Sequence, residues 1–175
     1  MKILAFAASN NVNSINQKLT RYAASLIEQA DIEMLSIDDY EMPLFSDTRE
    51  KELGSPALAQ QFHQKIGEAD AIIISFAEHN GTYTAAYKNL FDWASRIKGK
   101  VFQNKPMILL STSPGAGGAA NVLKTAVESA PYFGADVKGS LSIPSFFENF
   151  DIQTNQLTNE DLKAELLVIS NLISG

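Results

Sequence analysis

Three segments of the sequence gather hydroxyl, amide and glycine residues, and each follows an apolar run of strand length. The first, residues 9–16, reads Ser-Asn-Asn-Val-Asn-Ser-Ile-Asn and leads into a helical pattern. Unpaired backbone N–H groups at a helix start, with the positive end of the helix dipole, bind anions. Further donors are the side chains of Ser9, Asn10, Asn11, Ser14 and Asn16. The segment therefore predicts a phosphate-binding loop.

The residue types that are absent from this first segment limit the classes of ligand that it could bind. It contains no glycine, lysine or arginine. A dinucleotide-binding turn would read G-x-G-x-x-G and a nucleotide triphosphatase G-x-x-x-x-G-K-[ST], and neither motif is present. A mononucleotide such as FMN is therefore favoured. The alternative is that Ser14 and Gln17 only form a capping box for the following helix.

The second and third segments are suited to the edge of a flat polar ligand. Residues 77–83 read Ala-Glu-His-Asn-Gly-Thr-Tyr, and residues 111–118 read Ser-Thr-Ser-Pro-Gly-Ala-Gly-Gly. Glycine lets the backbone approach a ligand without a Cβ clash, which suits the rim of a flavin ring. In an open α/β sheet, ligands bind beyond the carboxyl ends of the strands, where strand order reverses. We therefore expect the three segments to converge.

Other chemistries find less support in the sequence. Glu78 and His79 could form an acid–base pair, or a triad with Ser113, but no G-x-S-x-G nucleophile elbow exists and Ser113 precedes a proline. A metal site is not expected, because His63 and His79 are the only histidines and cysteine is absent. We therefore assign no catalytic acid or base to these residues.

The elements that must position these segments alternate between strand and helix. Apolar runs such as Ile72-Ile73-Ile74 are typical of parallel strands that are covered on both faces. We predict an α/β fold, a three-layer sandwich around a five-stranded parallel sheet of order 2-1-3-4-5. The expected strands are residues 3–8, 32–37, 71–76, 107–110 and 137–143.

Helical periodicity fills the spaces between these strands. Ser55 and Pro56 start the second helix, residues 118–130 form the fourth, and Thr158 with Asp161 caps the fifth. Two segments, 38–54 and 144–155, are expected to be long loops that serve as lids or interface segments. The second contains Phe146, Phe147 and Phe150, which cannot all be exposed to water.

Composition limits the class of protein. With 175 residues and 45% hydrophobic content, residues 1–175 are expected to form a single domain. The net charge of −6 argues against nucleic-acid and membrane partners. The absence of cysteine excludes disulfides and thiolate chemistry and is compatible with a cytoplasmic location. No run approaches the roughly 20 apolar residues of a membrane span, and residues 1–8 are interpreted as a core strand rather than a signal peptide.

Over nearly its whole length the sequence resembles the NAD(P)H-dependent FMN reductases of the flavodoxin-like superfamily, which include quinone and chromate reductases. Their first loop, Gly-Ser-x-Arg-x-x-Ser-x-Asn, is similar to the segment with Ala8, Ser9, Asn11, Ser14 and Asn16. Their Pro-Glu-Tyr-Asn, followed by Leu-Lys-Asn-x-x-Asp-Trp, is matched by Ala77, Glu78, His79 and Asn80, then by Lys88, Asn89, Asp92 and Trp93. Their Ser-x-Ser-x-Gly-x-x-Gly is matched by Ser111, Ser113, Gly115 and Gly118.

The resemblance implies FMN as cofactor and NAD(P)H as hydride donor, with electrons passing to flavin, quinone or other small acceptors. The phosphate would be held by Ser9, Asn10, Asn11, Ser14, Ile15 and Asn16. The ring would be lined by Ala77, Glu78, His79, Asn80, Gly81, Thr82, Ser111, Ser113, Gly115, Gly117 and Gly118.

Three residues depart from the family pattern. Asn11 replaces an arginine and so removes a charge-assisted phosphate contact, His79 replaces a tyrosine, and Ala77 replaces a proline. The lost charge at residue 11 leaves a flavin-free binding module open, and a non-enzymatic flavodoxin-like electron carrier is a second alternative. The resemblance also implies a homodimer or tetramer, and we expect Phe91, Trp93 and the three phenylalanines of segment 144–155 to supply apolar interface surface.

Overall fold

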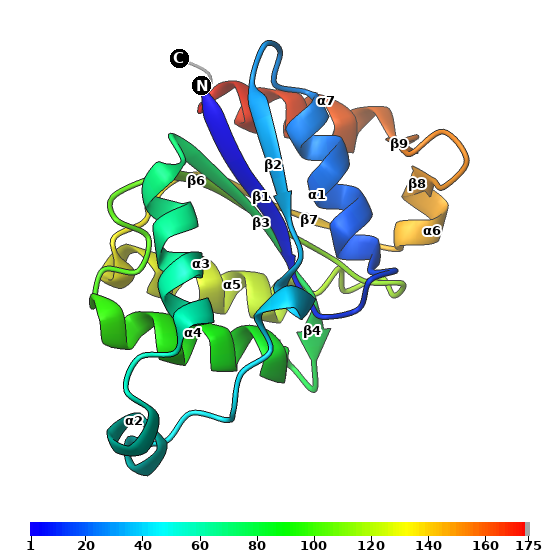
Figure 1. Ribbon diagram of the computed structural model, residues 1–175. Coiled ribbons are helices and arrows are strands. Elements are labelled where there is room, and N and C mark those ends of the chain that lie inside the picture. Colours follow the sequence, from blue (N-terminus) through cyan, green and yellow to red (C-terminus); the bar gives the residue numbers. More distant parts are fainter. Residues whose placement is uncertain (174–175) are drawn as a thin grey trace.

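A five-stranded parallel sheet forms the centre of the computed structural model, which describes residues 1–173 (Figure 1). The strand order is β2-β1-β3-β6-β7, which confirms the predicted order 2-1-3-4-5. The chain reverses its direction of winding between β1 and β3, so the loops after these two strands diverge at one point of the sheet edge. The strands are β1 (Lys2–Ala8), β2 (Asp31–Leu35), β3 (Ala71–Phe76), β6 (Pro106–Thr112) and β7 (Asp136–Ile143).

Helices cover both faces of the sheet, as the apolar strand pattern predicts (Figure 1). Alternate residues of β1 point to opposite faces: Leu4 and Phe6 belong to one core cluster, and Ile3 and Ala5 to the other. The first cluster is closed by α3 (Ala57–Glu68), α4 (Ala85–Ile97) and α5 (Ala120–Ser129). The second is closed by α1 (Ile15–Ser25) and α7 (Glu160–Asn171).

Two helix starts differ in detail from the prediction. The Ser14 hydroxyl does cap α1 by accepting the N–H of Asn16, but the Gln17 side chain accepts the N–H of Ala7 at 3.1 Å instead of completing a capping box. Asn159, not Thr158, caps α7, and its side chain accepts two backbone N–H groups there. Asparagine is as good a cap as threonine or better, so the predicted residue was wrong by one position.

Segment 38–54 is more ordered than the loop that the sequence predicts. It contains the short helices η1 (Ile37–Tyr40) and α2 (Asp47–Leu53), and α2 projects from the body of the molecule (Figure 1). Trp93 on α4 anchors the segment, because its indole N–H donates to the carbonyl of Pro43 at 2.7 Å and Phe45 packs edge-on against its ring. Arg96 adds an ion pair with Glu50 at 2.8 Å.

Segment 144–155 buries two of its three phenylalanines. It forms α6 (Phe146–Asn149) and β8 (Phe150–Asp151), and β8 pairs with β9 (Gln156–Leu157). Phe146 and Phe150 stack at 4.6 Å inside the second core cluster, whereas Phe147 is 58% exposed. Trp93 is also fully buried. The expectation that these rings provide an exposed apolar interface is therefore wrong, because the chain's own core takes most of them.

No helix among residues 1–173 is long and apolar enough to cross a membrane. The same residues contain no cluster of three or more histidine, aspartate or glutamate side chains placed to hold a metal ion.

Candidate functional site

The loop between β1 and α1 is fastened mainly by its own short side chains. The Ser9 hydroxyl accepts the N–H of Asn11 at 3.2 Å, and the Asn11 carboxamide oxygen accepts the N–H of Asn13 at 2.9 Å. The carbonyl of Asn11 accepts the N–H of Ser14 at 2.9 Å. These bonds hold the loop in a fixed shape at the start of α1, where the helix dipole is positive.

Several donors of this loop remain available to a ligand. The backbone N–H groups of Asn10, Val12 and Ile15 make no hydrogen bond within residues 1–173. The exposed carboxamide of Asn10 and the free hydroxyl protons of Ser9 and Ser14 add to them. A phosphate group needs such a set of donors at a helix start, and this loop offers it with neutral groups alone.

Asn16 has a different position from the other residues of its segment. It is 2% exposed, and its Oδ1 accepts hydrogen bonds from the Ser75 hydroxyl at 2.7 Å and from the N–H of Thr112 at 3.1 Å. Its Nδ2 donates to the carbonyl of Thr112 at 3.2 Å. The side chain therefore joins α1 to the carboxyl ends of β3 and β6. Sequence reasoning missed Ser75, although it interrupts the otherwise apolar strand β3, and it did not foresee that Thr112 at the end of β6 contacts Asn16.

Residues 78–83 form a hairpin that extends beyond the carboxyl end of β3. Its strands are β4 (Glu78–His79) and β5 (Thr82–Tyr83), which pair in antiparallel register. Asn80 and Gly81 both have positive φ, 53° and 81°, as a two-residue type I′ turn requires. The turn is exposed, and Ala77 and Glu78 at its base are half-buried.

The glycine loop after β6 presents free backbone donors next to this hairpin. Within residues 1–173, the N–H groups of Gly115, Ala116 and Gly117 make no hydrogen bond, and all three residues are exposed. Gly118 closes the loop with φ 58°, and its carbonyl accepts the hydroxyls of Ser111 at 2.8 Å and Ser142 at 2.9 Å. The buried Ser111 side chain thus stabilises the loop from inside the protein. The Ser113 hydroxyl donates a hydrogen bond to the carbonyl of Gly115 at 3.2 Å.

Two side-chain contacts fasten the hairpin to α5. The Glu78 carboxylate accepts the backbone N–H of Val122 at 2.9 Å, near the start of α5. The hydroxyls of Tyr83 and Ser129 are 3.3 Å apart, near its end. The hairpin and the glycine loop therefore share one support, since α5 follows the glycine loop directly.

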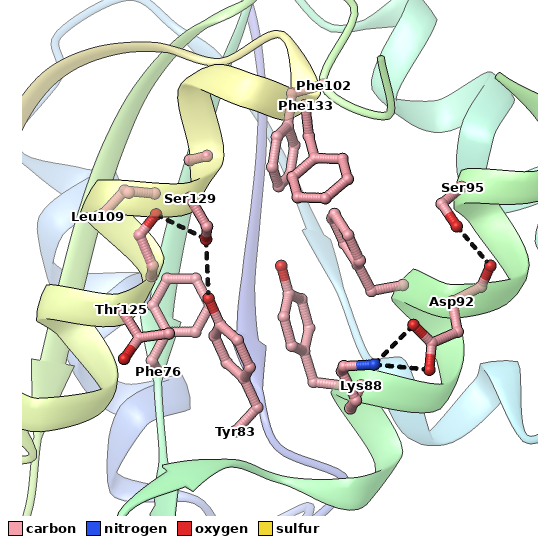
Figure 2. A pocket seen from close by; sticks show the side chains of 14 residues that line it. Phe76, Tyr83, Lys88, Asp92, Ser95, Phe102, Leu109, Thr125, Ser129 and Phe133 are labelled. Carbon is pink, nitrogen blue, oxygen red and sulfur yellow. Dashed lines mark hydrogen bonds and ion pairs between the residues drawn. The ribbon is translucent and has the colours of Figure 1, made fainter. Parts of the chain in front are cut away.

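A cavity of about 220 Å³ lies between α4 and α5, and Tyr83 of the hairpin forms part of its wall (Figure 2). Six aromatic rings line it: Phe76, Tyr83, Tyr87, Phe91, Phe102 and Phe133. The Lys88–Asp92 ion pair of 2.7 Å lies on the α4 side of the cavity, and the Ser129 hydroxyl lies on the α5 side (Figure 2). Burial raises the pKa of Tyr87 well above its ordinary value, so this phenol stays neutral.

Solved structures of similar fold place the chain in the flavodoxin-like class. The chain superposes on the flavoenzyme NAD(P)H:(acceptor) oxidoreductase of Paracoccus denitrificans with a TM-score of 0.81 and 23% identity, covering 99% of this chain and 94% of that one. A flavodoxin variant from Pseudomonas aeruginosa gives a TM-score of 0.60 and 15% identity, and both chains are covered completely. These likenesses concern the fold.

Sequence comparison defines the family within this class. The family model described as NADPH-dependent FMN reductase matches residues 1–148, and the chain belongs to this family of flavin-dependent oxidoreductases, which use NAD(P)H with FMN. A curated relative, the 2-hydroxy-1,4-benzoquinone reductase of a Burkholderia species, is 34% identical over 121 residues, or 69% of this chain. The match covers 64% of the length of that relative, slightly less than two thirds.

Proposed function

We propose that the protein binds FMN at the carboxyl edge of the sheet, takes hydride from NAD(P)H and passes electrons to flavin, quinone or other small acceptors. One observation carries the proposal: the two loops that bracket the hairpin, each next to a helix start, both leave backbone N–H groups unpaired within residues 1–173. Family membership identifies the cofactor chemistry that such a site serves.

In this proposal the loop of residues 9–15 holds the FMN phosphate. Its ligands are the backbone N–H groups of Asn10, Val12 and Ile15, helped by the hydroxyls of Ser9 and Ser14 and by Asn10 and Asn11. Asn16 stabilises the loop through its hydrogen bonds to Ser75 and Thr112 at the ends of β3 and β6. Because these ligands are neutral, the helix dipole supplies the positive charge that the family's arginine would give.

The hairpin and the glycine loop would line the ring of the flavin. Bound FMN supplies the hydride-accepting chemistry, and the protein orients it and tunes its electronics. The N–H groups of Gly115, Ala116 and Gly117 would donate to the ring edge that becomes negative on reduction. The turn of Asn80 and Gly81, with His79 and Thr82, would form the rim of the site, with Ala77 and Glu78 at its base.

We further propose a homodimer or tetramer that assembles through α4 and α5. The support is an exposed aromatic ring next to a cavity. Tyr132 of η2 (Ala130–Phe133) is 84% exposed and borders a shallow surface pocket. Thr125 and Ser129 line both this pocket and the aromatic cavity. A two-fold axis near Ser129 would let the Tyr132 ring of each copy fill the cavity of the other. This face replaces the phenylalanine segment of residues 144–155 as the proposed contact.

Replacing Tyr132 with serine tests this assembly. Sedimentation at micromolar concentration should give a dimer or tetramer for the wild type and a monomer for Tyr132→Ser. The variant Phe147→Ser removes a comparably exposed ring elsewhere and should leave the assembly unchanged. Loss of assembly in Phe147→Ser, with Tyr132→Ser unaffected, would refute the proposed face.

We propose that residues 1–175 form one domain, that the protein acts in the cytoplasm on small molecules, and that it has no nucleic-acid or membrane partner. The net charge of −6 supports the last point.

The function is tested by titrating purified protein with FMN and assaying oxidation of NADH and NADPH with a soluble quinone. FMN binding at one site per chain with quinone-dependent turnover is expected. Tight FMN binding without nucleotide oxidation would indicate an electron carrier, and no FMN binding would indicate a flavin-free binding module. Either of these two results would refute the proposal.

A further inference from the structure

The start of α5 has no capping side chain of its own. Its N-cap residue is Ala119, in the left-handed region with φ 59°, and no side chain there accepts a hydrogen bond. A helix leaves its first four backbone N–H groups unpaired, and serine, threonine, aspartate and asparagine are the usual caps. Here the cap comes from 44 residues away, because the Glu78 carboxylate accepts the N–H of Val122 at 2.9 Å.

This contact joins the two loops that the proposed function places around the flavin ring. Glu78 begins the hairpin and pairs with Tyr83 in its register. Val122 lies four residues after Gly118, which closes the glycine loop. One carboxylate therefore sets the spacing between the hairpin and the glycine loop, and the contact between Tyr83 and Ser129 keeps the other hairpin strand on the same helix.

The contact also changes the charge at this end of the sheet. A helix start carries about half a positive elementary charge, which favours a nearby anion. The full negative charge of Glu78 on the start of α5 more than offsets it. Reduced flavin is more negative than oxidised flavin, so a carboxylate at this position makes reduction of a bound flavin less favourable.

We propose that Glu78 is a positioning residue with two effects: it caps α5 to fix the spacing of the hairpin and the glycine loop, and it lowers the reduction potential of FMN held between them. The proposal rests on the proposed function, because it requires FMN at this site. It assigns to Glu78 a contact with the protein's own helix rather than with substrate.

Two substitutions separate the effects. Glu78→Gln keeps an oxygen acceptor for the N–H of Val122 and removes the charge, whereas Glu78→Ala removes both. Glu128→Gln is the matched control, because it removes a carboxylate from the same helix at an exposed position whose ion pair, with Lys124, is 4.0 Å long. The measurements are the dissociation constant of oxidised FMN, its two-electron reduction potential, and the melting temperature of the FMN-free protein.

We expect Glu78→Gln to bind oxidised FMN within about threefold of the wild type and to favour reduced over oxidised FMN by about tenfold more, a rise of about 30 mV for two electrons. Glu78→Ala should melt about 2–4 °C lower than the wild type without flavin and bind oxidised FMN about tenfold more weakly. Glu128→Gln should match the wild type in all three measurements.

The outcomes distinguish this inference from the proposed function. Failure of the wild type to bind FMN would overturn the proposed function. With FMN bound, equal potentials in Glu78→Gln and Glu128→Gln would overturn the electrostatic effect. An unchanged melting temperature and FMN affinity in Glu78→Ala would overturn the positioning effect.

Discussion

The Ser75 hydroxyl donates a 2.7 Å hydrogen bond to the carboxamide oxygen of Asn16, and both residues are almost completely buried. The same oxygen accepts the N–H of Thr112, so three elements meet at one amide. The loop that follows β1 leads directly to Asn16, so these hydrogen bonds hold the end of the loop in place. The loop of residues 9–15 therefore depends on a buried polar contact at the sheet edge, through a side chain that solvent hardly reaches.

Asn16→Ala should lower the free energy of unfolding by about 2–4 kcal/mol, because it leaves the Ser75 hydroxyl and both backbone groups of Thr112 buried without this partner. Urea unfolding measures the loss. Asn13→Ala, an exposed change in the neighbouring loop, should stay within about 0.5 kcal/mol of the wild type. Equal losses in the two variants would show that the buried hydrogen bonds of Asn16 contribute nothing to the free energy of unfolding.

Gly118→Ala should destabilise the glycine loop strongly. Its φ is +58°, and an added Cβ would lie 2.3 Å from the Ser142 hydroxyl and 3.1 Å from the backbone nitrogen of Pro144. We expect a loss of about 2–3 kcal/mol. Gly117→Ala is the matched control, because an added Cβ there would have no atom within 4 Å and its φ is not positive. A loss in Gly117→Ala as large as in Gly118→Ala would refute this explanation of the loop.

A negative charge at the N-cap of α1 tests whether the loop of residues 9–15 binds the phosphate of FMN. Ser14→Asp keeps a good capping side chain but puts a negative charge beside the expected phosphate. FMN affinity should fall at least about tenfold, or about 1.4 kcal/mol. Riboflavin, which lacks the phosphate, should bind the variant and the wild type equally. Fluorescence titration measures both ligands.

The converse change supplies the missing cation. Asn11→Arg restores the charge that the family pattern carries, so FMN affinity should rise about fivefold while riboflavin affinity stays constant. Equal changes for FMN and riboflavin, in either variant, would mean that the loop does not contact the phosphate.

His63 on α3 should make stability depend on pH. Burial, with a smaller contribution from Lys98, lowers its pKa below the ordinary 6.5, and its Nε2 has no hydrogen-bond partner among residues 1–173. Between the folded and the unfolded pKa the unfolded chain binds more protons, so stability falls as the pH drops below about 6.5. His63→Gln should show a shallower decline in urea unfolding from pH 7.5 to 5.5. Parallel declines would contradict the burial effect.

The sequence predicts the fold and the three loops because each rests on local patterns. The apolar runs of the five strands and the helix start after Ser14 are readable without tertiary information. Long-range contacts are not readable in this way. The contact between Glu78 and Val122 joins residues far apart in the chain, and only folding reveals that α5 lacks its own cap.

The same limit explains the predictions that were incomplete. The sequence alone does not show whether an asparagine is exposed in a loop or buried with hydrogen bonds to neighbouring strands. Asn16, which is buried, could therefore not be distinguished from Asn10, which is exposed. Phe146 and Phe150 sit in a segment without strong periodicity, and their burial against each other and the second core cluster depends on a four-residue helix.

We propose that this chain holds FMN where NAD(P)H can reduce it. The most direct test is the visible absorption of the FMN-loaded protein on addition of NADH or NADPH without oxygen. The flavin absorption should bleach with one of the nucleotides and return when a quinone is added. A protein that binds FMN tightly but keeps its flavin absorption with both nucleotides, while dithionite bleaches it, would refute the proposed function.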